Sequence, residues 1–445
     1  MSSVPRVASA LQRTLLTVPA ALERETGFCQ RRSKCSGALF VQTLVFGFLA
    51  EPHPSLFTLT TTAAQRGVLL SPQGLDQRFT PAGARLLEGV LTALATEVIA
   101  ADPVPISLLR RFPAVVLLDS TTITLPDALA PVWAGCGGRV ATHTQAALKV
   151  TIRWDLVTGH FDGPVLSAGR TQDRATALQH RPIPAGGIRI ADVGFFSLQV
   201  CQELGAQSAS FLSRLPAQTV LYPAGSDERL DLMTWLTEQG ARPGTRAECA
   251  VDLGTDFRIP ARLLAVRVPP EVAAERRATI EYDAHREGER PSVRALERAD
   301  WTLLVTNVPA AQLTIAEALA LLRARWQIEL LFKLWKDLAQ LDAWTTAKPD
   351  RIRCEVLAKL IAVVIAHWIE LTGAYTHADH SLHRAFLTIR THSASLIPVL
   401  HRRRALLAAL RTLATTLGGT GHLIKRKRRP TSAQLLANPA ALALA

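Results

Sequence analysis

Short apolar runs typical of β-strands lie between residues 114 and 215, and they set the expected architecture. Five of them predict strands, at 114–118, 147–154, 161–167, 188–191 and 210–215. The first three form a meander with a turn at Thr158-Gly159, and a helix-like stretch separates the last two. Strands interrupted by helices predict an α/β domain with its functional residues at the carboxyl ends of the strands.

The first 100 residues have the pattern of short helices joined by turns. Ser71-Pro72 is typical of a helix start with Ser as the N-cap, and Thr80-Pro81 begins a further helix that includes residues 86–99. This arrangement fits a helix-turn-helix that binds DNA, and it fits equally well a helical cap on the next domain. The sequence leaves both alternatives open.

After residue 215 the pattern changes. Residues 216–300 are rich in Pro, Gly and charge, and we expect a β-rich insertion with strands at 262–268 and 278–282. The elements expected beyond it are a strand at 301–306, one long helix capped by Thr314 and reaching about Leu338, and further helices over 350–415.

The composition is that of a globular protein with a core, since 48% of the residues are hydrophobic and 20% are charged. The formal net charge of +13 and the isoelectric point of about 10.1 favour a polyanionic partner. The basic run Lys425–Arg429 either binds phosphate or is simply solvated.

The cysteine and histidine patterns predict no metal or disulfide framework. The six cysteines form no CxxC pair, so we expect reduced thiols. His377, His380 and His383 form an HxxHxxH run near Asp379, which we interpret as a polar loop or a helix start.

No segment is expected to enter a membrane. The longest apolar stretches, 38–50 and 360–369, are shorter than the roughly 20 residues that span a bilayer. The N-terminus carries Arg6 and Arg13 but no signal-peptide cleavage pattern. We therefore expect a cytoplasmic protein.

The most informative segment runs from Leu322 to Lys336. At about 100° per residue in a helix, Arg325, Glu329 and Lys336 share one face. The adjoining apolar stripe comprises Ile328, Leu331, Phe332, Trp335 and Leu338. Taken alone, this face could be an exposed Arg–Glu pair that contributes a few tenths of a kcal/mol.

Two aspartates elsewhere in the chain favour a functional role for this face. Asp119 and Asp192 each follow an apolar strand and precede small, turn-forming or helix-starting residues, where a carboxylate can face a cleft. With Glu329 they supply hard oxygen ligands that suit two Mg²⁺ or Mn²⁺ ions acting on a phosphodiester. Asp155 and Asp173 are weaker candidates, because a turn and a helix cap account for them.

The motifs around these acids resemble those of the DDE transposases of the insertion-sequence "IS-four" family, over about residues 40–375. Leu118-Asp119-Ser120-Thr121 resembles the first-acid motif of that family. Ala191-Asp192-Val193-Gly194-Phe195-Phe196 resembles the second, which usually reads Ala-Asp-Arg-Gly followed by Tyr or Phe.

The third motif is the most specific. Arg325, Glu329 and Lys336 match the family signature Tyr-x2-Arg-x3-Glu-x6-Lys in residue type and spacing. Two positions differ from the family pattern. Leu322 stands at the signature tyrosine and cannot hydrogen-bond a phosphate, and Val193 stands where the second motif usually has arginine.

The resemblance implies an RNase H-like catalytic core, interrupted by the insertion at 216–300. It implies that Asp119, Asp192 and Glu329 are the catalytic residues and bind two Mg²⁺ or Mn²⁺ ions. It also implies excision through a DNA hairpin, by a homodimer that holds two transposon ends.

Four residues are the expected DNA contacts. Arg325 and Lys336 beside the glutamate would hold the phosphate chain. Trp301 occupies the place of a family tryptophan that stacks on a flipped base, although a core tryptophan is a close alternative. Arg214 is placed like a DNA-contacting arginine of the family, and a surface salt bridge is its alternative.

The expected fold is therefore α/β, an RNase H-like core with a β-rich insertion between helical terminal regions. Its expected parts are a helical, DNA-binding region at 1–110, the first part of the core at 111–215, the insertion at 216–300, the second part of the core with the glutamate helix at 301–345, and a helical region with a basic tail at 346–445.

These features together predict a metal-dependent DNA transposase of a bacterial cytoplasm, associated with the nucleoid. Its DNA partners would be the terminal inverted repeats of the transposon and the target. Two alternatives stay open, namely a catalytically silent DNA-binding protein derived from a transposase and a metal-dependent nuclease on the same core.

Overall fold

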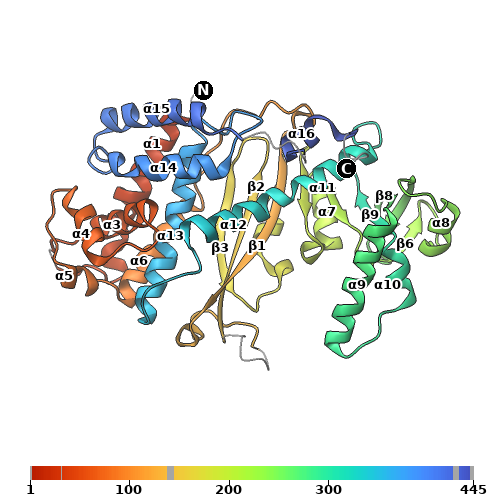
Figure 1. Cartoon of the computed structure of the whole chain (residues 1–445), viewed down its shortest axis with the longest axis horizontal. Coiled ribbons are helices and arrows are strands. Elements are labelled where there is room, and N and C mark those ends of the chain that lie inside the picture. The colour runs from red at the N-terminus through yellow and green to blue at the C-terminus, as the bar shows by residue number, and fades with distance from the viewer. Residues whose placement is uncertain (1–2, 32, 138–144, 424–429, 441–445) are drawn as a thin grey trace. The chain divides into compact units, whose positions relative to one another are not determined.

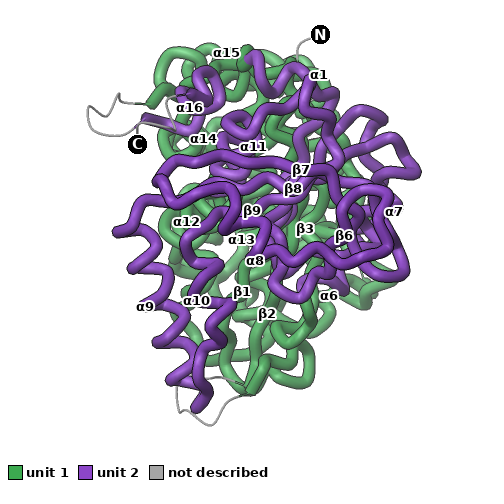
Figure 2. Tube along the Cα trace, turned by 90° about the vertical axis from the view of Figure 1, so that its right-hand side faces the viewer, with its two compact units in different colours: residues 1–106, 119–172, 327–426 green, residues 107–118, 173–326, 427–445 purple. Residues whose placement is uncertain are grey.

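The computed structural model describes residues 3–31, 33–137, 145–423 and 430–440 of the chain (Figure 1). It comprises two compact units (Figure 2). Unit 1 contains residues 1–106, 119–172 and 327–426, and unit 2 contains residues 107–118, 173–326 and 427–445. One boundary falls directly before Asp119, and another falls between Trp326 and Gln327, shortly before Glu329.

Within the described residues, nine strands form one mixed sheet, and all five strands expected between residues 114 and 215 are among them. Their bounds are β1 (Val115–Leu125), β2 (Ala146–Asp155), β3 (Phe161–Ala168), β4 (Ile188–Ala191), β5 (Ser210–Arg214), β6 (Leu221–Pro223), β7 (Arg246–Leu253), β8 (Ile259–Arg267) and β9 (Trp301–Thr306). Their order is β3-β2-β1-β4-β5-β9-β8-β7-β6. β1, β4 and β5 are parallel, whereas β5, β9, β8, β7 and β6 pair antiparallel in turn.

β1 is longer than the sequence analysis expected. Its apolar first part ends at Leu118, but the strand continues through Asp119 to Leu125. The second part is rich in β-branched side chains, which favour extended backbone. Asp119 therefore lies within a strand, and the expectation that the strand ends just before it was wrong.

The helices of unit 1 surround one long buried helix. They are α1 (Val4–Gln12), α2 (Val18–Glu25), α3 (Gly37–Ala50), α4 (Leu56–Ala64), α5 (Pro72–Asp76), α6 (Pro81–Leu94), most of α12 (Trp326–Ala339), α13 (Pro349–Glu370), α14 (Leu382–Leu396) and α15 (Arg403–Thr420). α13 packs against α3, α6 and α14, so the apolar stretch 360–369 is part of a core helix. Among the described residues, no helix combines the length and the apolar character needed to cross a bilayer.

Unit 2 carries the remaining helices, and one of them corrects an expectation. They are α7 (Leu198–Ala206), α8 (Leu232–Glu238), α9 (Pro270–Glu287), α10 (Val293–Arg298), α11 (Ile315–Ala324) and α16 (Ser432–Ala437). Residues 278–282, expected as a strand, lie inside α9. Pro in the first turn, many Ala, Glu and Arg residues, and a left-handed Gly288 at the C-cap all favour the helix.

The single long helix expected from Thr314 is two helices. Thr314 does cap α11, in a reciprocal capping box with Glu317. The helical pattern is interrupted at Arg325, and α12 begins at the next residue. The interruption therefore falls inside the Arg-Glu-Lys segment that the sequence analysis singled out.

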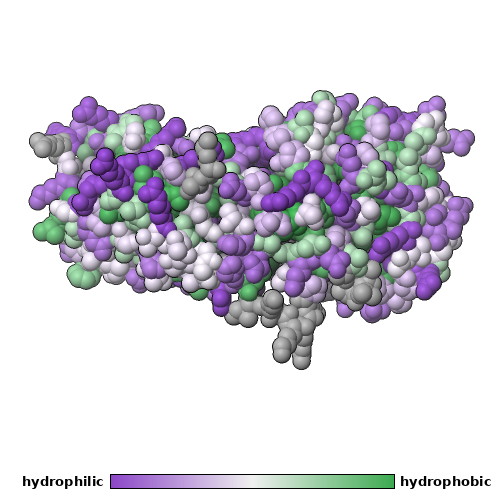
Figure 3. All heavy atoms as spheres, turned by 90° about the horizontal axis from the view of Figure 1, so that it is seen from above, coloured by the Kyte–Doolittle hydropathy of each residue, from purple (hydrophilic) through white to green (hydrophobic). Residues whose placement is uncertain are grey.

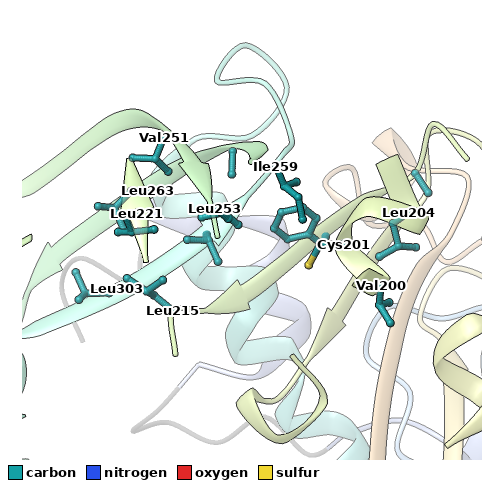
Figure 4. Close-up of a cluster of buried hydrophobic side chains, with 14 of the residues drawn as sticks. Val200, Cys201, Leu204, Leu215, Leu221, Val251, Leu253, Ile259, Leu263 and Leu303 are labelled. Carbon is teal, nitrogen blue, oxygen red and sulfur yellow. The ribbon is translucent and has the colours of Figure 1, made fainter. Parts of the chain in front are cut away.

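The core of unit 2 joins α7 to the part of the sheet formed by β5 to β9 (Figure 4). Val200, Cys201 and Leu204 of α7 are buried in the same cluster as apolar side chains of β7, β8 and β9. Residues 216–300, expected as a β-rich insertion, form three strands and three helices, and these strands belong to the same sheet as β1 to β5.

Candidate active site

The pairing of β1 with β4 brings two motifs to the same level of the sheet in unit 2. The two strands are parallel, and Leu118 is the register partner of Ala191. The next residue in each segment is the aspartate singled out from the sequence, Asp119 in one and Asp192 in the other. The spacing of the two motifs along the chain gives no hint of this match, which depends on strand register alone.

The two aspartates differ in their surroundings. Asp119 is half-buried, and its Oδ1 accepts a hydrogen bond of 2.8 Å from the amide of Ser120. Asp192 stands directly after β4, and its side chain is 50% exposed. An Nη2 atom of Arg325 lies 4.0 Å from Asp192 Oδ1, within ion-pair distance.

The turn that follows Asp192 is held by a buried arginine. Arg189 on β4 donates hydrogen bonds of 2.8 Å to the carbonyl of Phe195 and 2.9 Å to Gln179 Oε1. Sequence analysis did not single out this arginine, because an arginine within a short strand gives no signal of its burial. Its contacts give it a positioning role for the segment that carries Asp192.

Asp173 lies beside the same turn. A Cβ added to Gly194 would be 3.1 Å from Asp173 Oδ2, so this carboxylate lies next to a residue only two positions after Asp192. The sequence analysis ranked Asp173 as a weak candidate, and its backbone does begin a short 3₁₀ turn, Asp173–Ala175.

Helix α12 carries the third acid on the expected face. Ile328, Leu331, Phe332 and Trp335 are buried, and the ring of Trp335 lies 6.2 Å from that of Phe161 in unit 1. The expected apolar stripe is confirmed except for Leu338, which is half-buried. Glu329 is half-buried on the adjoining face.

Lys336 ties this helix to β1. Its Nζ donates a 3.0 Å hydrogen bond to the carbonyl of Thr122, three residues after Asp119. Glu329 precedes Lys336 by seven residues, which is about two helical turns or 10.5 Å. Three residues of strand span about 10 Å, so Glu329 and Asp119 are separated from this contact by similar lengths.

Trp301 and Arg214 differ in their access to a ligand. Trp301 is 5% exposed and belongs to the core of unit 2, with the guanidinium of Arg267 5.4 Å from its ring. This is the core role that the sequence analysis kept as the alternative, and base stacking would require the ring to leave the core. Arg214 is exposed at the end of β5.

Trp326 is a candidate that the sequence analysis missed. It is the first residue of α12, directly after Arg325, and it is 55% exposed. Its position outside the apolar stripe was the available signal, since an exposed tryptophan next to an arginine is typical of a surface that binds a ligand.

The expected DNA-binding helices at the N-terminus have a structural role. Ser71 and Thr80 cap α5 and α6 as expected. Asp76 at the end of α5 pairs with Lys348 at 2.7 Å and with Arg351 at 3.4 Å, and the hydrogen bond from Lys348 lowers the pKa of Asp76. These contacts tie α5 to the start of α13, and DNA binding by these helices stays a prediction.

The other candidate clusters have local partners. All six cysteines are free thiols. His422 Nδ1 is 3.1 Å from Asp379 Oδ1, and His380 Nδ1 is 2.8 Å from the carbonyl of His377. The basic run Lys425–Arg429 lies outside the described residues. In the part of the chain that the structure describes, no three His, Cys, Asp or Glu side chains are grouped so that they could hold a metal ion.

Comparison with known proteins gives consistent matches. A sequence model of the family described as "Transposase DDE domain" matches residues 110–365. The chain is 27% identical over 361 residues to the transposase for insertion sequence element IS231C of Bacillus thuringiensis subsp. berliner, covering 77% of this chain and 75% of that protein. The transposase for insertion sequence element IS231E of Bacillus thuringiensis subsp. finitimus is 26% identical, with the same coverage.

Proposed function

We propose, from the premise that this chain belongs to the transposases with a DDE domain, that it excises an insertion sequence and joins it to a new site. The family match covers more than half of the chain, including all three acids, and it brings with it an RNase H-like core. The chain is therefore a DNA-cleaving and strand-transferring enzyme.

The register of β1 and β4 carries the assignment of the site. Leu118 and Ala191 are register partners within unit 2, and Asp119 and Asp192 are the next residues of the chain after these two partners. Glu329 lies on α12 between Arg325, which precedes the helix and is near Asp192, and Lys336, which is bonded to β1. We assign Asp119, Asp192 and Glu329 as the catalytic residues.

The donor set of these three residues fits a hard divalent cation. Three carboxylates without a thiol or an imidazole suit Mg²⁺ or Mn²⁺ better than zinc or copper. Two such ions, when bound, activate the attacking oxygen and stabilise the leaving oxygen at a phosphodiester. Since the described residues contain no ready group of three ligands, the proposal requires the carboxylates to come together when DNA and metal bind.

The cations beside Glu329 have a separate task. Arg325 has a planar guanidinium that can bind two phosphate oxygens at once, and its side chain is 16% exposed, so it is largely held in place before DNA arrives. Lys336 holds α12 to β1 and offers a point charge to the phosphate chain. We propose that Trp326 and Arg214 contact the same DNA. Trp301 can stack on a DNA base only if its ring leaves the core of unit 2.

Further parts of the proposal come from the resemblance to this family. They are a hairpin intermediate at the transposon end, a homodimer that holds two ends, and action on the nucleoid DNA of a bacterial cytoplasm. The transposases of the IS231 elements support the insertion-sequence class of substrate.

The decisive experiment uses a duplex that carries the inverted repeats flanking the gene. The full chain with Mg²⁺ should nick this duplex, cut it through and join the 3′ end to a second DNA, and EDTA should stop all three steps. Asp119→Asn and Asp192→Asn should bind the duplex but leave it uncut. Cleavage by both variants at the rate of the wild type would refute the assignment of the site.

A second candidate function is favoured by one observation. Leu322 replaces the signature tyrosine, and the loss of this phosphate contact favours a DNA-binding protein without catalysis. In the same assay such a protein would bind the duplex without nicking it, whereas a nuclease would cut without joining.

A further inference from the structure

The excess positive charge of this chain is concentrated at one end. Residues 380–445 contain eleven Lys and Arg and no Asp or Glu, so they carry eleven of the thirteen net positive charges. The rest of the chain, with 39 basic and 37 acidic residues, is nearly neutral. Five of the eleven cations lie in the undescribed basic run, and the other six are arginines of the described segment.

Helix α15 displays most of the described arginines on one surface of unit 1. Arg402 precedes the helix, Arg403 begins it, and Arg404 and Arg411 follow two turns apart. Leu406, Leu410, Leu413 and Leu417 form its buried stripe. Arg404 and Arg411 are exposed on the other side, and Arg402 is exposed just before the helix. Figure 3 shows strongly hydrophilic side chains over the part of unit 1 that includes α15.

Helix α1 adds to this surface. Arg403 Nη2 donates a 2.9 Å hydrogen bond to the carbonyl of Pro5, which fixes α1 beside the start of α15. Arg6, the next residue, is exposed. We call the surface formed by Arg6, Arg402, Arg403, Arg404 and Arg411 the α15 basic face.

The α15 basic face is not neutralised within the described chain. None of its five arginines is paired with a carboxylate among the residues that the structure describes. Arg402 and Arg403 are bonded to backbone carbonyls, which leave their positive charge uncompensated. Concentrated, unpaired arginines repel one another, so such a surface is favourable only with a polyanion on it.

The spacing on this face suits duplex DNA. Arg404 and Arg411 are about 10.5 Å apart along the helix axis and about 20° apart around it. The major groove of B-DNA is about 12 Å wide, so two such arginines can reach phosphates on both of its sides. The exposed residue between them, Ala408, is small, which lets a sugar-phosphate chain approach closely.

We propose that the α15 basic face binds the phosphate backbone of duplex DNA, outside the catalytic residues, without reading its sequence. The proposal rests on the proposed function, since it gives the enzyme a second hold on DNA during transposition. The duplex held there is either the transposon end with its flank or the target, and both offer the same chemistry.

The test measures binding of the full chain to a random-sequence duplex in EDTA, over a range of salt concentrations. The variant Arg402→Gln/Arg404→Gln/Arg411→Gln should bind at least about tenfold more weakly at low salt. The slope of log K against log salt should fall by about 0.9 for each lost phosphate contact. An unchanged affinity and slope would overturn the proposal.

Two controls separate charge from folding. The variant Arg402→Lys/Arg404→Lys/Arg411→Lys keeps the charge and should retain most of the binding, and equal weakening of the Lys and Gln variants would overturn the proposal. The variant Arg242→Gln/Arg246→Gln/Arg290→Gln removes three exposed arginines of unit 2 and should bind like the wild type. If it weakened binding as much as the α15 variant, net charge alone would explain the effect and the α15 basic face would have no special role.

The source of the DNA is decided in a transposition assay with Mg²⁺. If the α15 variant cuts the transposon end normally but joins it poorly to a second DNA, the face holds the target. If cutting itself is slow, the face holds the end or its flank. Binding in EDTA needs no catalysis, so failure of the wild type to cut DNA would refute the proposed function and not this inference.

Discussion

Helices α12 and α15 share a plan and differ in the charges they expose. Each buries an apolar stripe, with Ile328, Leu331 and Trp335 in α12 and four leucines in α15. α12 carries the half-buried Glu329 between Arg325, which directly precedes the helix, and Lys336, whereas the charged residues of α15 are all arginines. The stripe decides which side of each helix meets the core, and the presence of an acid decides whether the other side can bind metal or only phosphate.

Removing the charge of Glu329 from the α12 face should have the largest effect on activity. Glu329→Gln keeps the shape of the side chain but loses its charge, so cleavage should fall by about a thousandfold or more, corresponding to several kcal/mol of lost metal-assisted stabilisation. The measurement is the rate of end cleavage with Mg²⁺. Asp337→Asn, exposed on the same helix, is the matched control and should cut normally.

Truncating a buried leucine of the apolar stripe should lower the free energy of unfolding by a similar amount in α12 and in α15. Leu410→Ala in α15 and Leu331→Ala in α12 each leave a cavity under a buried stripe, at a cost of about 2–5 kcal/mol. Thermal unfolding should show a drop of several degrees in both variants. Thr412→Ala, exposed beside Leu410, should leave Tm unchanged, and a large shift there would contradict the assigned stripe.

The cation at the far end of the α12 face should have an intermediate effect. Lys336→Met loses the hydrogen bond to the carbonyl of Thr122 and a charge for phosphate, so end cleavage should fall by about tenfold to a hundredfold. Single-turnover cleavage measures this effect. Lys333→Met removes an exposed lysine of the same helix, and similar losses in both variants would mean that Lys336 acts only through net charge.

A buried lysine of α13, Lys359, should make the free energy of unfolding depend on pH. Burial lowers the pKa of Lys359 to about 8, while its Nζ donates to the carbonyls of Gln340 and Ala343. Between this pKa and the ordinary value of 10.5, the unfolded chain binds more protons than the folded one. The free energy of unfolding therefore increases as pH rises through this range.

The variant Lys359→Met should lack this increase in the free energy of unfolding, because it has no amine at this position to titrate. The difference in Tm between the wild type and this variant should move in favour of the wild type as pH rises from about 7 to about 9.5. Lys333→Met, at an exposed lysine of α12, is the matched control variant. A constant difference for Lys359→Met would mean that this amine titrates normally.

The smallest expected effect is a gain. Leu322→Tyr restores the signature hydroxyl one turn before Arg325, and one added hydrogen bond to phosphate should raise end affinity by about twofold to tenfold. Leu322→Phe adds the ring without the hydroxyl and should give no gain. Equal gains from both would assign the effect to the aromatic ring.

Much of the fold was predictable from local patterns. The strands β2, β4, β5 and β9 follow the expected runs closely, because each combines apolar side chains with flanking turn residues. The errors came where two propensities compete. The segment 278–282 has aromatic and β-branched residues but lies in a chain of strong helix formers, and Asp119 is followed by β-branched residues that extend the strand.

The candidate site was predictable in residue type but not in arrangement. The seven-residue spacing of Glu329 and Lys336 places them on one face of α12 by the geometry of the α-helix alone, whereas the interruption at Arg325 was not predictable from that spacing. Arg189 gave no signal, and Trp326 gave only its position outside the apolar stripe. The burial of one and the exposure of the other depend on neighbours far away in the chain.

The sequence by itself determined the apolar stripes, the acids and their motifs, and the concentration of charge after residue 380, since each is a property of neighbouring residues along the chain. Only the tertiary structure decided that Leu118 faces Ala191, that Lys336 reaches Thr122, and that Trp301 is buried. The physical reason is that strand register and helix docking are fixed by packing between distant segments, which no local pattern contains.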